Sequence, residues 1–407
     1  MDSRRALCDL EPFHVEDTVG GTVYTGFFVE QINEQKPRFD TLLAGVVLLL
    51  LAIGAGMLLS ASWFRAEQLY SDPLRFVMRQ AMWIGVGTVL MLIACVVPLR
   101  VVRKLLPVLV IGTMILSVLT FLPGVSARYM GARRWIIVFN VSFQPSELVK
   151  VVLVLYLAHI LARREGDFTQ PLQSLLPPAL IVTIFAGIVL LQNDYSTAMF
   201  LIIVSLAIFY MAGVPLIHFV RIFVLVVPIS TILLFTREHR VRRILTFLNP
   251  EFDPAGSGFQ VLAARRALEN GGPWGTGIGQ GVRKMGGLPE AQSDFIFAVI
   301  GEELGFIGVV LLIGLFLLLA VRGLSLARRQ SDWFRFLLIY GMTMSIVAQA
   351  LVNFAVVSGM VPATGLPLPF FSSGGSSMVV TLVMCGLIFN ASQSTPGDPR
   401  FWEGRRV

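Results

Sequence analysis

Charged residues are scarce in this chain of 407 residues: Asp, Glu, Lys and Arg make up only 14% of it, while hydrophobic residues make up 55%. Soluble domains carry about 25% charged residues, so a water-soluble enzyme of this length would lack the charge that its surface needs. Cysteine and histidine are also sparse. The three cysteines, two of which lie inside apolar segments, make neither a disulfide framework nor a zinc cluster. The four histidines have no metal-ligand spacing.

The chain does contain a series of long apolar segments. A helix needs about 20 apolar residues to cross the hydrocarbon core of a membrane. Ten segments meet this requirement, over residues 40–62, 77–97, 102–122, 146–162, 174–192, 196–213, 216–235, 295–321, 334–358 and 374–391. We therefore predict an all-α polytopic membrane protein with about ten transmembrane helices. The longest connection, residues 236–294, is too polar to span and should form a large loop between helices 7 and 8.

The distribution of Lys and Arg predicts the orientation, because short cytoplasmic loops carry an excess of both. With the N-terminus in the cytoplasm, inner segments hold 17 of them: Arg4, Arg5, Lys36, Arg38, Arg100, Arg103, Lys104, Arg163, Arg164, Arg221, Arg322, Arg328, Arg329, Arg335, Arg400, Arg405 and Arg406. Short outer loops hold only 6: Arg65, Arg75, Arg79, Arg128, Arg133 and Arg134. We expect an acidic cytoplasmic tail over residues 1–39, a ten-helix domain over 40–391 and a cytoplasmic C-terminal tail over 392–407.

The large loop 236–294 then lies outside, although it is basic. It carries Arg237, Arg240, Arg242, Arg243, Arg265, Arg266, Arg283 and Lys284. It is either a solvated basic loop or, together with Arg133 and Arg134, an electropositive outer cavity for an anionic substrate such as a diphosphate-linked lipid head group. The formal net charge of +7 belongs to no separate basic domain, so we expect anionic lipid and no nucleic acid as a partner.

Ionisable residues within spans cost about 2.5–3.5 kcal/mol each on insertion scales, so each needs a partner or a function. Glu147 and Lys150 are three residues apart and face the same side of a helix. We expect them to form an ion pair. Asp194 lies between two spans, where it either caps the following helix or pairs with Lys150.

Asp294 is the last polar residue before the eighth span, in the sequence SDFIFAVIGEELG. It either caps that helix or acts as a general base at the junction of the basic loop and the membrane. Glu302 and Glu303 follow about 12–13 Å deeper along a helix. At that depth both carboxylates should face protein or water rather than lipid.

Two segments are rich in glycine or proline. Residues 270–282 contain GxGxG spacing without the strand-then-helix context of a nucleotide site. We expect this backbone to wrap closely around a ligand or another loop. Residues 359–377 lie between the last two spans and should be buried in protein or line a cavity.

Several long motifs resemble the SEDS family (shape, elongation, division, sporulation), whose members include FtsW and RodA. They are GARRWI at 131–136, FQPSELVK at 143–150, QNDYSTA at 192–198, GTGIGQGVRKMGGLPEAQSDFIFAVIGEELGFIG at 275–308 and GLPLPFFSSGGSS at 365–377. The family fold has ten transmembrane helices and a large outer loop between the seventh and the eighth. The sequences GEELG and GLPLPF resemble the FtsW branch, which implies a role in cell division. Asn193, Tyr195 and Ser196 depart from the family's usual QPDLGTA motif.

The resemblance implies a peptidoglycan glycosyltransferase of the bacterial cytoplasmic (inner) membrane that polymerises lipid II into glycan strands. It also implies as partners a class B penicillin-binding protein and other divisome or elongasome membrane proteins. The family's catalytic aspartate falls on Asp294, the Glu and Lys of its QPSE motif on Glu147 and Lys150, and a third conserved carboxylate on Asp194.

The chemistry of glycosyl transfer needs a base for the acceptor hydroxyl and cations for the leaving diphosphate. Asp294 is the candidate base, and inversion at the anomeric carbon is expected. The substrate-binding candidates are Arg133, Arg134, Arg243, Arg265, Arg266, Lys284, Ser372 and Ser373. The one cofactor candidate is a divalent cation, Mg or Mn, which would share the work of stabilising the diphosphate. A lipid flippase that uses the intramembrane charges and a non-catalytic scaffold for a transpeptidase are the alternative functions.

Overall fold

A computed structural model describes residues 22–25, 28–31, 40–122, 126–129, 132–138, 141–164, 171–236, 238–249, 251, 256–282, 284 and 291–393. Chain contacts separate residues 39–392 from the terminal segments 1–38 and 393–407. The N-terminal segment contains an antiparallel hairpin of β1 (Thr22–Thr25) and β2 (Phe28–Gln31), in which Thr22 faces Gln31. No strand was expected in this tail. The C-terminal tail from 394 onward lies outside the described residues.

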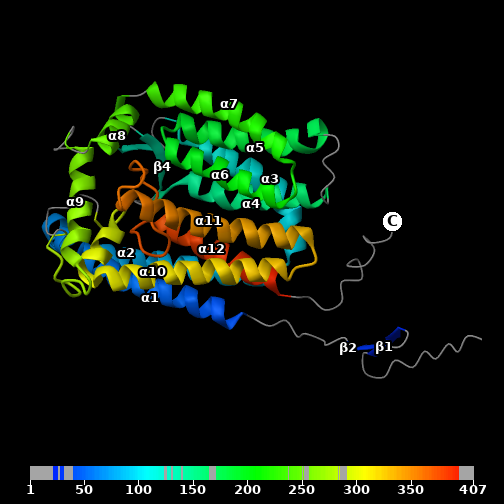
Figure 1. Cartoon of the computed structure of the whole chain (residues 1–407), viewed down its shortest axis with the longest axis horizontal. Helices are drawn as coiled ribbons and strands as arrows, with labels where there is room; N and C mark the ends of the chain where they lie inside the picture. The colour runs from blue at the N-terminus through cyan, green and yellow to red at the C-terminus, as the bar shows by residue number, and fades with distance from the viewer. Residues whose placement is uncertain are drawn as a thin grey trace, which may run out of the picture. The chain divides into compact units, whose positions relative to one another are not determined.

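All ten predicted segments are helical, and the helices run along one axis (Figure 1). Within the described residues, nine helices have the length and composition to cross a membrane, and α6 is a shorter apolar helix of 17 residues. The chain is therefore a multi-pass membrane protein. The ten helices are α1 (Thr41–Tyr70), α2 (Arg75–Val96), α3 (Leu99–Leu119), α4 (Pro145–Ala162), α5 (Pro171–Leu191), α6 (Tyr195–Met211), α7 (Leu216–Phe235), α10 (Ile296–Arg328), α11 (Trp333–Val357) and α12 (Gly375–Ser392).

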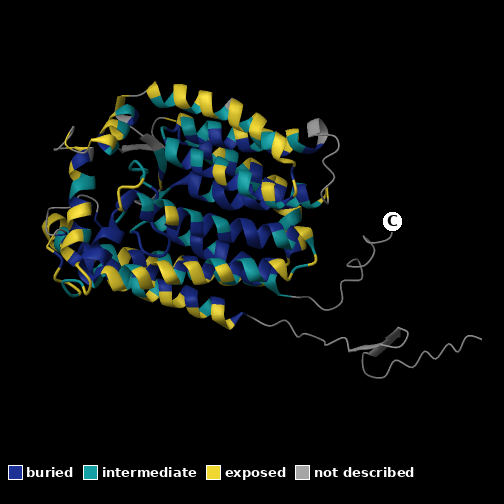
Figure 2. Cartoon of the chain, viewed as in Figure 1, coloured by how far each residue is buried: buried dark blue, intermediate teal, exposed yellow. Residues whose placement is uncertain are grey.

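The centre of the bundle is formed by α4, α11 and α12, whose residues are mostly buried, while few residues of α2, α3 and α7 are buried (Figure 2). Apolar side chains exposed on α7, such as Phe223 and Ile232, face the position of lipid in a membrane. Proline lies inside α3, α5 and α7, which transmembrane helices tolerate. The helix starts are capped where the chain provides an acceptor: Asp40 accepts from the backbone N–H of Leu43 at 2.8 Å, and its carboxylate also pairs with Arg322 on α10.

Two short helices that the sequence analysis did not anticipate lie in the large loop. They are α8 (Glu238–Leu248) and α9 (Ser257–Gly271), at the end of the bundle where α7 stops and α10 begins (Figure 1). A three-stranded antiparallel sheet of β3 (Ser126–Tyr129), β4 (Ala132–Val138) and β5 (Val141–Phe143) also precedes α4. In its register Ser126 faces Ile136, Ile136 faces Phe143, and the pairing shifts between Ala127 and Tyr129.

The eighth span is not one straight helix, because α10 breaks at Gly305, where the backbone is left-handed (φ 66°). The break leaves backbone groups without helical partners. The glycine-rich segment supplies them: Thr276 and Gly277 donate to the carbonyls of Glu302 and Glu303, at 2.9 and 3.0 Å. In the other direction, the N–H groups of Phe306 and Ile307 donate to the carbonyls of Gly272 and Pro273, at 2.9 and 3.2 Å. The expected close wrapping of residues 270–282 is therefore around the break in α10.

Candidate active site

Asp294 lines a cavity of about 170 Å³. The residue is partly buried and directly precedes α10. Other polar walls of the cavity come from the outer loop and the α11–α12 region: Arg243 on α8, Gln260 on α9, Asn353 on α11 and Thr364 in the following loop. The cavity thus collects segments that are far apart in the sequence around one carboxylate.

The backbone at residues 292–294 is held by contacts with α11 and with the loop 359–374. The Asn353 amide donates to the Asp294 carbonyl at 3.0 Å. The Ser372 hydroxyl donates to the Ser293 carbonyl, and the Ser373 N–H donates to the Gln292 carbonyl at 2.9 Å. The N-cap position of α10 belongs to Phe295, which has no side-chain cap. Asp294 lies one residue before this N-cap position.

Arg243 provides a positive charge at the cavity of Asp294. Its guanidinium donates to the Ala363 carbonyl at 3.2 Å. Burial by the surrounding cavity walls lowers the pKa of Arg243, and so does the charge of Arg134, whereas Asp294 and Asp194 raise it. Its side chain still has exposed surface, as expected for a residue that lines an open cavity. Two guanidinium groups and two carboxylates therefore lie close enough to influence one another.

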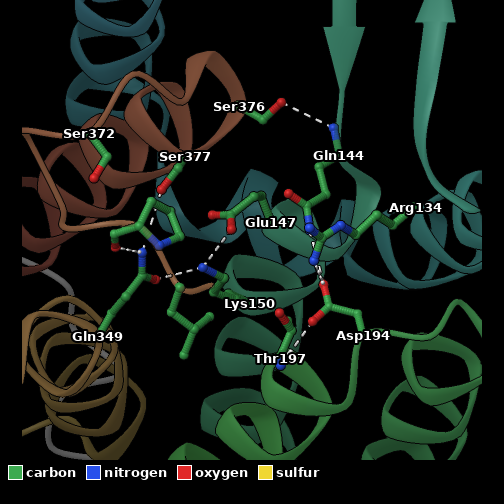
Figure 3. Close-up of polar contacts among 12 residues, drawn as sticks. Arg134, Gln144, Glu147, Lys150, Asp194, Thr197, Gln349, Ser372, Ser376 and Ser377 are labelled. Atoms are coloured by element: carbon green, nitrogen blue, oxygen red, sulfur yellow. Dashed lines mark hydrogen bonds and ion pairs between the residues drawn. The ribbon is translucent and has the colours of Figure 1, made fainter. Parts of the chain in front are cut away.

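Asp194 caps α6, accepting from the Thr197 N–H at 3.2 Å. The same carboxylate accepts from the Gln144 amide at 3.2 Å and pairs with Arg134 on β4 at 3.4 Å (Figure 3). The capping alternative is thus the observed one, and the cation paired with Asp194 is Arg134 rather than Lys150. The departure from the usual motif includes Asn193, which adopts a left-handed conformation (φ 65°).

Glu147 and Lys150 form a buried ion pair in the first two turns of α4, with 2.8 Å between Lys150 Nζ and Glu147 Oε1. Both side chains are almost fully buried, at 4% and 2% exposed. Lys150 also donates to Gln349 Oε1 on α11 at 2.6 Å (Figure 3). The pair therefore connects two of the central helices.

A second buried cluster joins Lys284 to Glu303. Lys284 Nζ lies 2.6 Å from Glu303 Oε1 and 2.8 Å from the Ser60 hydroxyl on α1. The carboxylates of Glu303 and Glu302 also accept from the N–H groups of Gly279 and Val282, at 3.1 and 3.2 Å. Both glutamates face protein, as their depth predicted. Lys284, expected among the cations around the substrate, instead has its charge balanced inside the protein.

The other substrate-binding candidates whose side chains the structure describes do not line the cavity of Asp294. Arg265 and Arg266 lie exposed on α9, where Arg265 pairs with Glu269, and neither lines the cavity of Asp294. The backbone of Arg133 belongs to β4, but its side chain lies outside the described part of the structure. Ser372 is buried and its hydroxyl is engaged with Ser293 and with the Leu368 N–H. The hydroxyl of Ser373 lies 3.4 Å from that of Ser293.

Sequence reasoning missed the uncharged amides Gln144, Gln349 and Asn353, which hold Asp194, Lys150 and Asp294. These amides carry no charge, so they do not stand out in an apolar segment as ionisable residues do. Gln349 and Asn353 are four residues apart in a largely apolar segment, so they share one face of the helix. This four-residue spacing of two amides in an apolar helix is the sequence feature that indicates their role.

No group of three or more His, Cys, Asp or Glu side chains within the described residues could hold a metal ion. A magnesium ion usually binds one or two carboxylates and completes its coordination with substrate phosphates and water. The protein thus offers single carboxylates such as Asp294 rather than a preformed cage.

Comparison with known proteins gives consistent matches over most of the chain. A family described as cell cycle protein (FtsW, RodA, SpoVE) matches residues 40–396. A "Probable peptidoglycan glycosyltransferase FtsW" from Borreliella burgdorferi is 38% identical over 86% of this chain and 95% of its own. A protein of the same name from Geobacter sp. (strain M18) is 36% identical over 88% and 98%. The stage V sporulation protein E of Bacillus subtilis is 35% identical over 89% and 99%.

Solved structures are similar as well. A chain from a study entitled "Structural coordination of polymerization and crosslinking by a peptidoglycan synthase complex" superposes with a TM-score of 0.71 and is 29% identical. The match covers 87% of this chain and 97% of that one. The rod shape determining protein RodA of Thermus thermophilus gives a TM-score of 0.64 and 27% identity over 87% and 96% of the two chains.

Proposed function

Because this chain belongs to the FtsW/RodA/SpoVE family of cell cycle proteins, we propose that it polymerises lipid II into peptidoglycan glycan strands. Relatives that align along nearly their whole length carry the name peptidoglycan glycosyltransferase. The observation that carries the proposal is the cavity that combines the carboxylate of Asp294 with the cation of Arg243. This is the pair of groups that glycosyl transfer from a diphosphate needs.

In the proposed reaction Asp294 removes the proton from the acceptor sugar hydroxyl as that oxygen attacks the anomeric carbon of the donor. The bond from this carbon to the lipid diphosphate breaks at the same time, so an α-linked donor gives a β-linked product. Arg243 and Arg134 stabilise the charge that develops on the leaving diphosphate. Since Arg134 already lowers the pKa of Arg243, an anion bound near both would relieve their mutual repulsion.

A transport function has less support, because the buried charges of the bundle are engaged with protein groups. Lys150 contacts Glu147 and Gln349, and Glu303 contacts Lys284 and Ser60. A path between leaflets would need such groups along a continuous route. The cavity at Asp294 instead lies at the end of the bundle near α8 and α9.

The proposal extends to location and partners. We place the protein in the cytoplasmic (inner) membrane of a bacterium with both termini in the cytoplasm, and we assign it to cell division because the relatives from Geobacter and Borreliella burgdorferi are named FtsW. A class B penicillin-binding protein would crosslink the strands, in line with the polymerisation and crosslinking named for the similar complex.

A Mg or Mn ion would accompany the substrate diphosphate, so polymerisation should fall when the ion is chelated and recover when it is restored.

The substitution Asp294→Asn tests the base assignment. We expect a folded protein whose lipid II polymerisation falls by about 10²–10⁴-fold, the usual cost of losing a positioned base. Asp332→Asn is the control for the same loss of charge outside the cavity: Asn keeps the cap of α11, and the weakened pair with Arg103 is partly exposed, where ion pairs contribute little. Polymer on a gel, thermal stability and complementation should be measured on both variants. Near-normal polymerisation by Asp294→Asn would remove this residue from the mechanism, and growth supported by an inactive variant would favour the scaffold alternative.

A further inference from the structure

Two uncharged amides lie one turn apart on α11 and are almost fully buried. Gln349 is 4% and Asn353 is 2% exposed. A buried amide is costly unless its polar atoms find partners; the amide nitrogens of both residues do, whereas Asn353 Oδ1 has no partner among the described residues. Between them these two side chains contact the ion pair Glu147–Lys150, the loop over residues 365–368 and the backbone of Asp294.

Gln349 connects the ion pair to the loop. Its Oε1 accepts from Lys150 Nζ at 2.6 Å, while its Nε2 donates to the carbonyl of Pro367 at 2.8 Å (Figure 3). Lys150 itself is held by Glu147 at 2.8 Å. A shift of the lysine would therefore move the Gln349 amide and, with it, the loop at Pro367.

Asn353 connects the loop to Asp294. Its Nδ2 donates to the carbonyls of both Asp294 and Leu366, each at 3.0 Å. Two carbonyl partners determine which way the amide points, because the opposite orientation would place its oxygen against two acceptors. The neighbouring Gly365 is left-handed (φ +74°), and a Cβ there would lie 3.5 Å from Asp294 Oδ2. The loop thus lies beside the reactive carboxylate in the wall of the same cavity, as well as being linked to its backbone through Asn353.

We propose that Gln349 and Asn353 are positioning residues, which transmit the position of the buried Glu147–Lys150 pair through residues 365–368 to Asp294. The inference rests on the proposed function, in which Asp294 is the base. In this inference the Glu147–Lys150 pair affects catalysis through the position of Asp294, without contacting the substrate. A base displaced by about 1 Å can lose about 10²-fold in rate, so small changes in this network should be visible in turnover.

The test compares steady-state lipid II polymerisation by Asn353→Leu and Gln349→Met, which keep side-chain volume and remove the bonds. We expect kcat to fall by about 10–10²-fold while KM for lipid II stays unchanged, because the base acts in the transition state. Ser345→Ala is the matched control: Ser345 is buried one turn before Gln349 and donates only within its own helix, to the Gly341 carbonyl. If Asn353→Leu yields no folded protein, Asn353→Ser removes the same amide donors with a smaller apolar change.

A double variant separates positioning from general stability. Gln349→Met combined with Asn353→Leu should lose less activity than the product of the two single losses, since both residues act on one loop. Normal kcat in folded Asn353→Leu and Gln349→Met, with Asp294→Asn inactive, would overturn the positioning role alone. Normal turnover by Asp294→Asn would overturn the base assignment together with this inference. If Ser345→Ala lost as much kcat as Asn353→Leu and Gln349→Met, the losses would be general structural effects, and the positioning role would also be overturned.

Discussion

Each of the two buried lysines, Lys150 and Lys284, contacts one glutamate and one polar side chain of another helix. Lys150 is held by Glu147 and Gln349, and Lys284 by Glu303 and Ser60. Breaking a buried pair by removing one partner typically costs about 3–5 kcal/mol, because it leaves an uncompensated charge. At the residue scale, buried lysines are therefore distinguished from Arg134 and Arg243, which keep exposed surface near the cavity.

This difference predicts opposite results for two cations of the same outer region. Lys284→Met should lower the yield of folded protein and its thermal midpoint, because Glu303 would remain buried without its partner. Arg243→Ala should leave most protein folded and raise KM for lipid II, because it removes an exposed cation that lines the cavity and bonds to the Ala363 carbonyl rather than to a buried carboxylate. Thermal denaturation and steady-state kinetics on both variants check this. A normal thermal midpoint for Lys284→Met together with a raised KM would return Lys284 to the substrate-binding residues.

At the element scale, α10 is stabilised across its break by the glycine-rich segment 271–282. The segment can approach closely only because it lacks side chains at the contact points. A Cβ on Gly275 would lie 2.2 Å from the carbonyl oxygen of Glu303, and Gly275 is left-handed (φ +81°). Backbone of this kind is tolerated at membrane depth only where its polar groups are satisfied by protein.

We expect Gly275→Ala to destabilise the protein by more than Gly279→Ala. Gly279 has a similar conformation (φ +85°), but a Cβ there would meet nothing within 4 Å. The control therefore carries only the backbone cost of alanine in a left-handed conformation, about 1–2 kcal/mol, while Gly275→Ala adds a steric clash with α10. The difference between the two thermal midpoints in detergent measures that clash. Equal midpoints would mean that the segment does not pack on α10 as described.

At the scale of the whole molecule, the bundle has one end with α8, α9 and the three-stranded sheet (Figure 1) and an opposite end with many arginines. At the arginine-rich end Arg322 pairs with Asp40 and Arg103 with Asp332, joining α1 to α10 and α3 to α11. We expect that end to lie in the cytoplasm, because short cytoplasmic loops carry an excess of Lys and Arg.

The orientation predicts the outcome of cysteine labelling in intact cells. In a variant without native cysteines, a cysteine at Gly256, which is exposed at the start of α9, should react with a membrane-impermeant thiol reagent. A cysteine at Ser325, near the end of α10, should react only after the cells are opened. The reverse pattern would invert the topology and move the Asp294 cavity to the wrong face for polymerising lipid II outside the cytoplasm.

The amino-acid sequence by itself determined the ten helices, the large loop and the Glu147–Lys150 pair. Apolar segments of sufficient length must be helical in a membrane, because only a helix satisfies its own backbone. Two charges three residues apart on one helix face are neighbours whatever surrounds them. These features depend on local spacing, which can be read directly from the chain.

Only the tertiary structure decided which distant residues meet. Lys284 could bind substrate or a carboxylate, and its neighbours Glu303 and Ser60 lie 19 and 224 residues away. The same holds for the pairing of Arg134 with Asp194 and for the link from Gln349 through Pro367 and Asn353 to Asp294. Amides and carbonyls are everywhere in a sequence and have many possible partners. Which of them bond is determined when α4, α10 and α11 pack and exclude water from the groups between them.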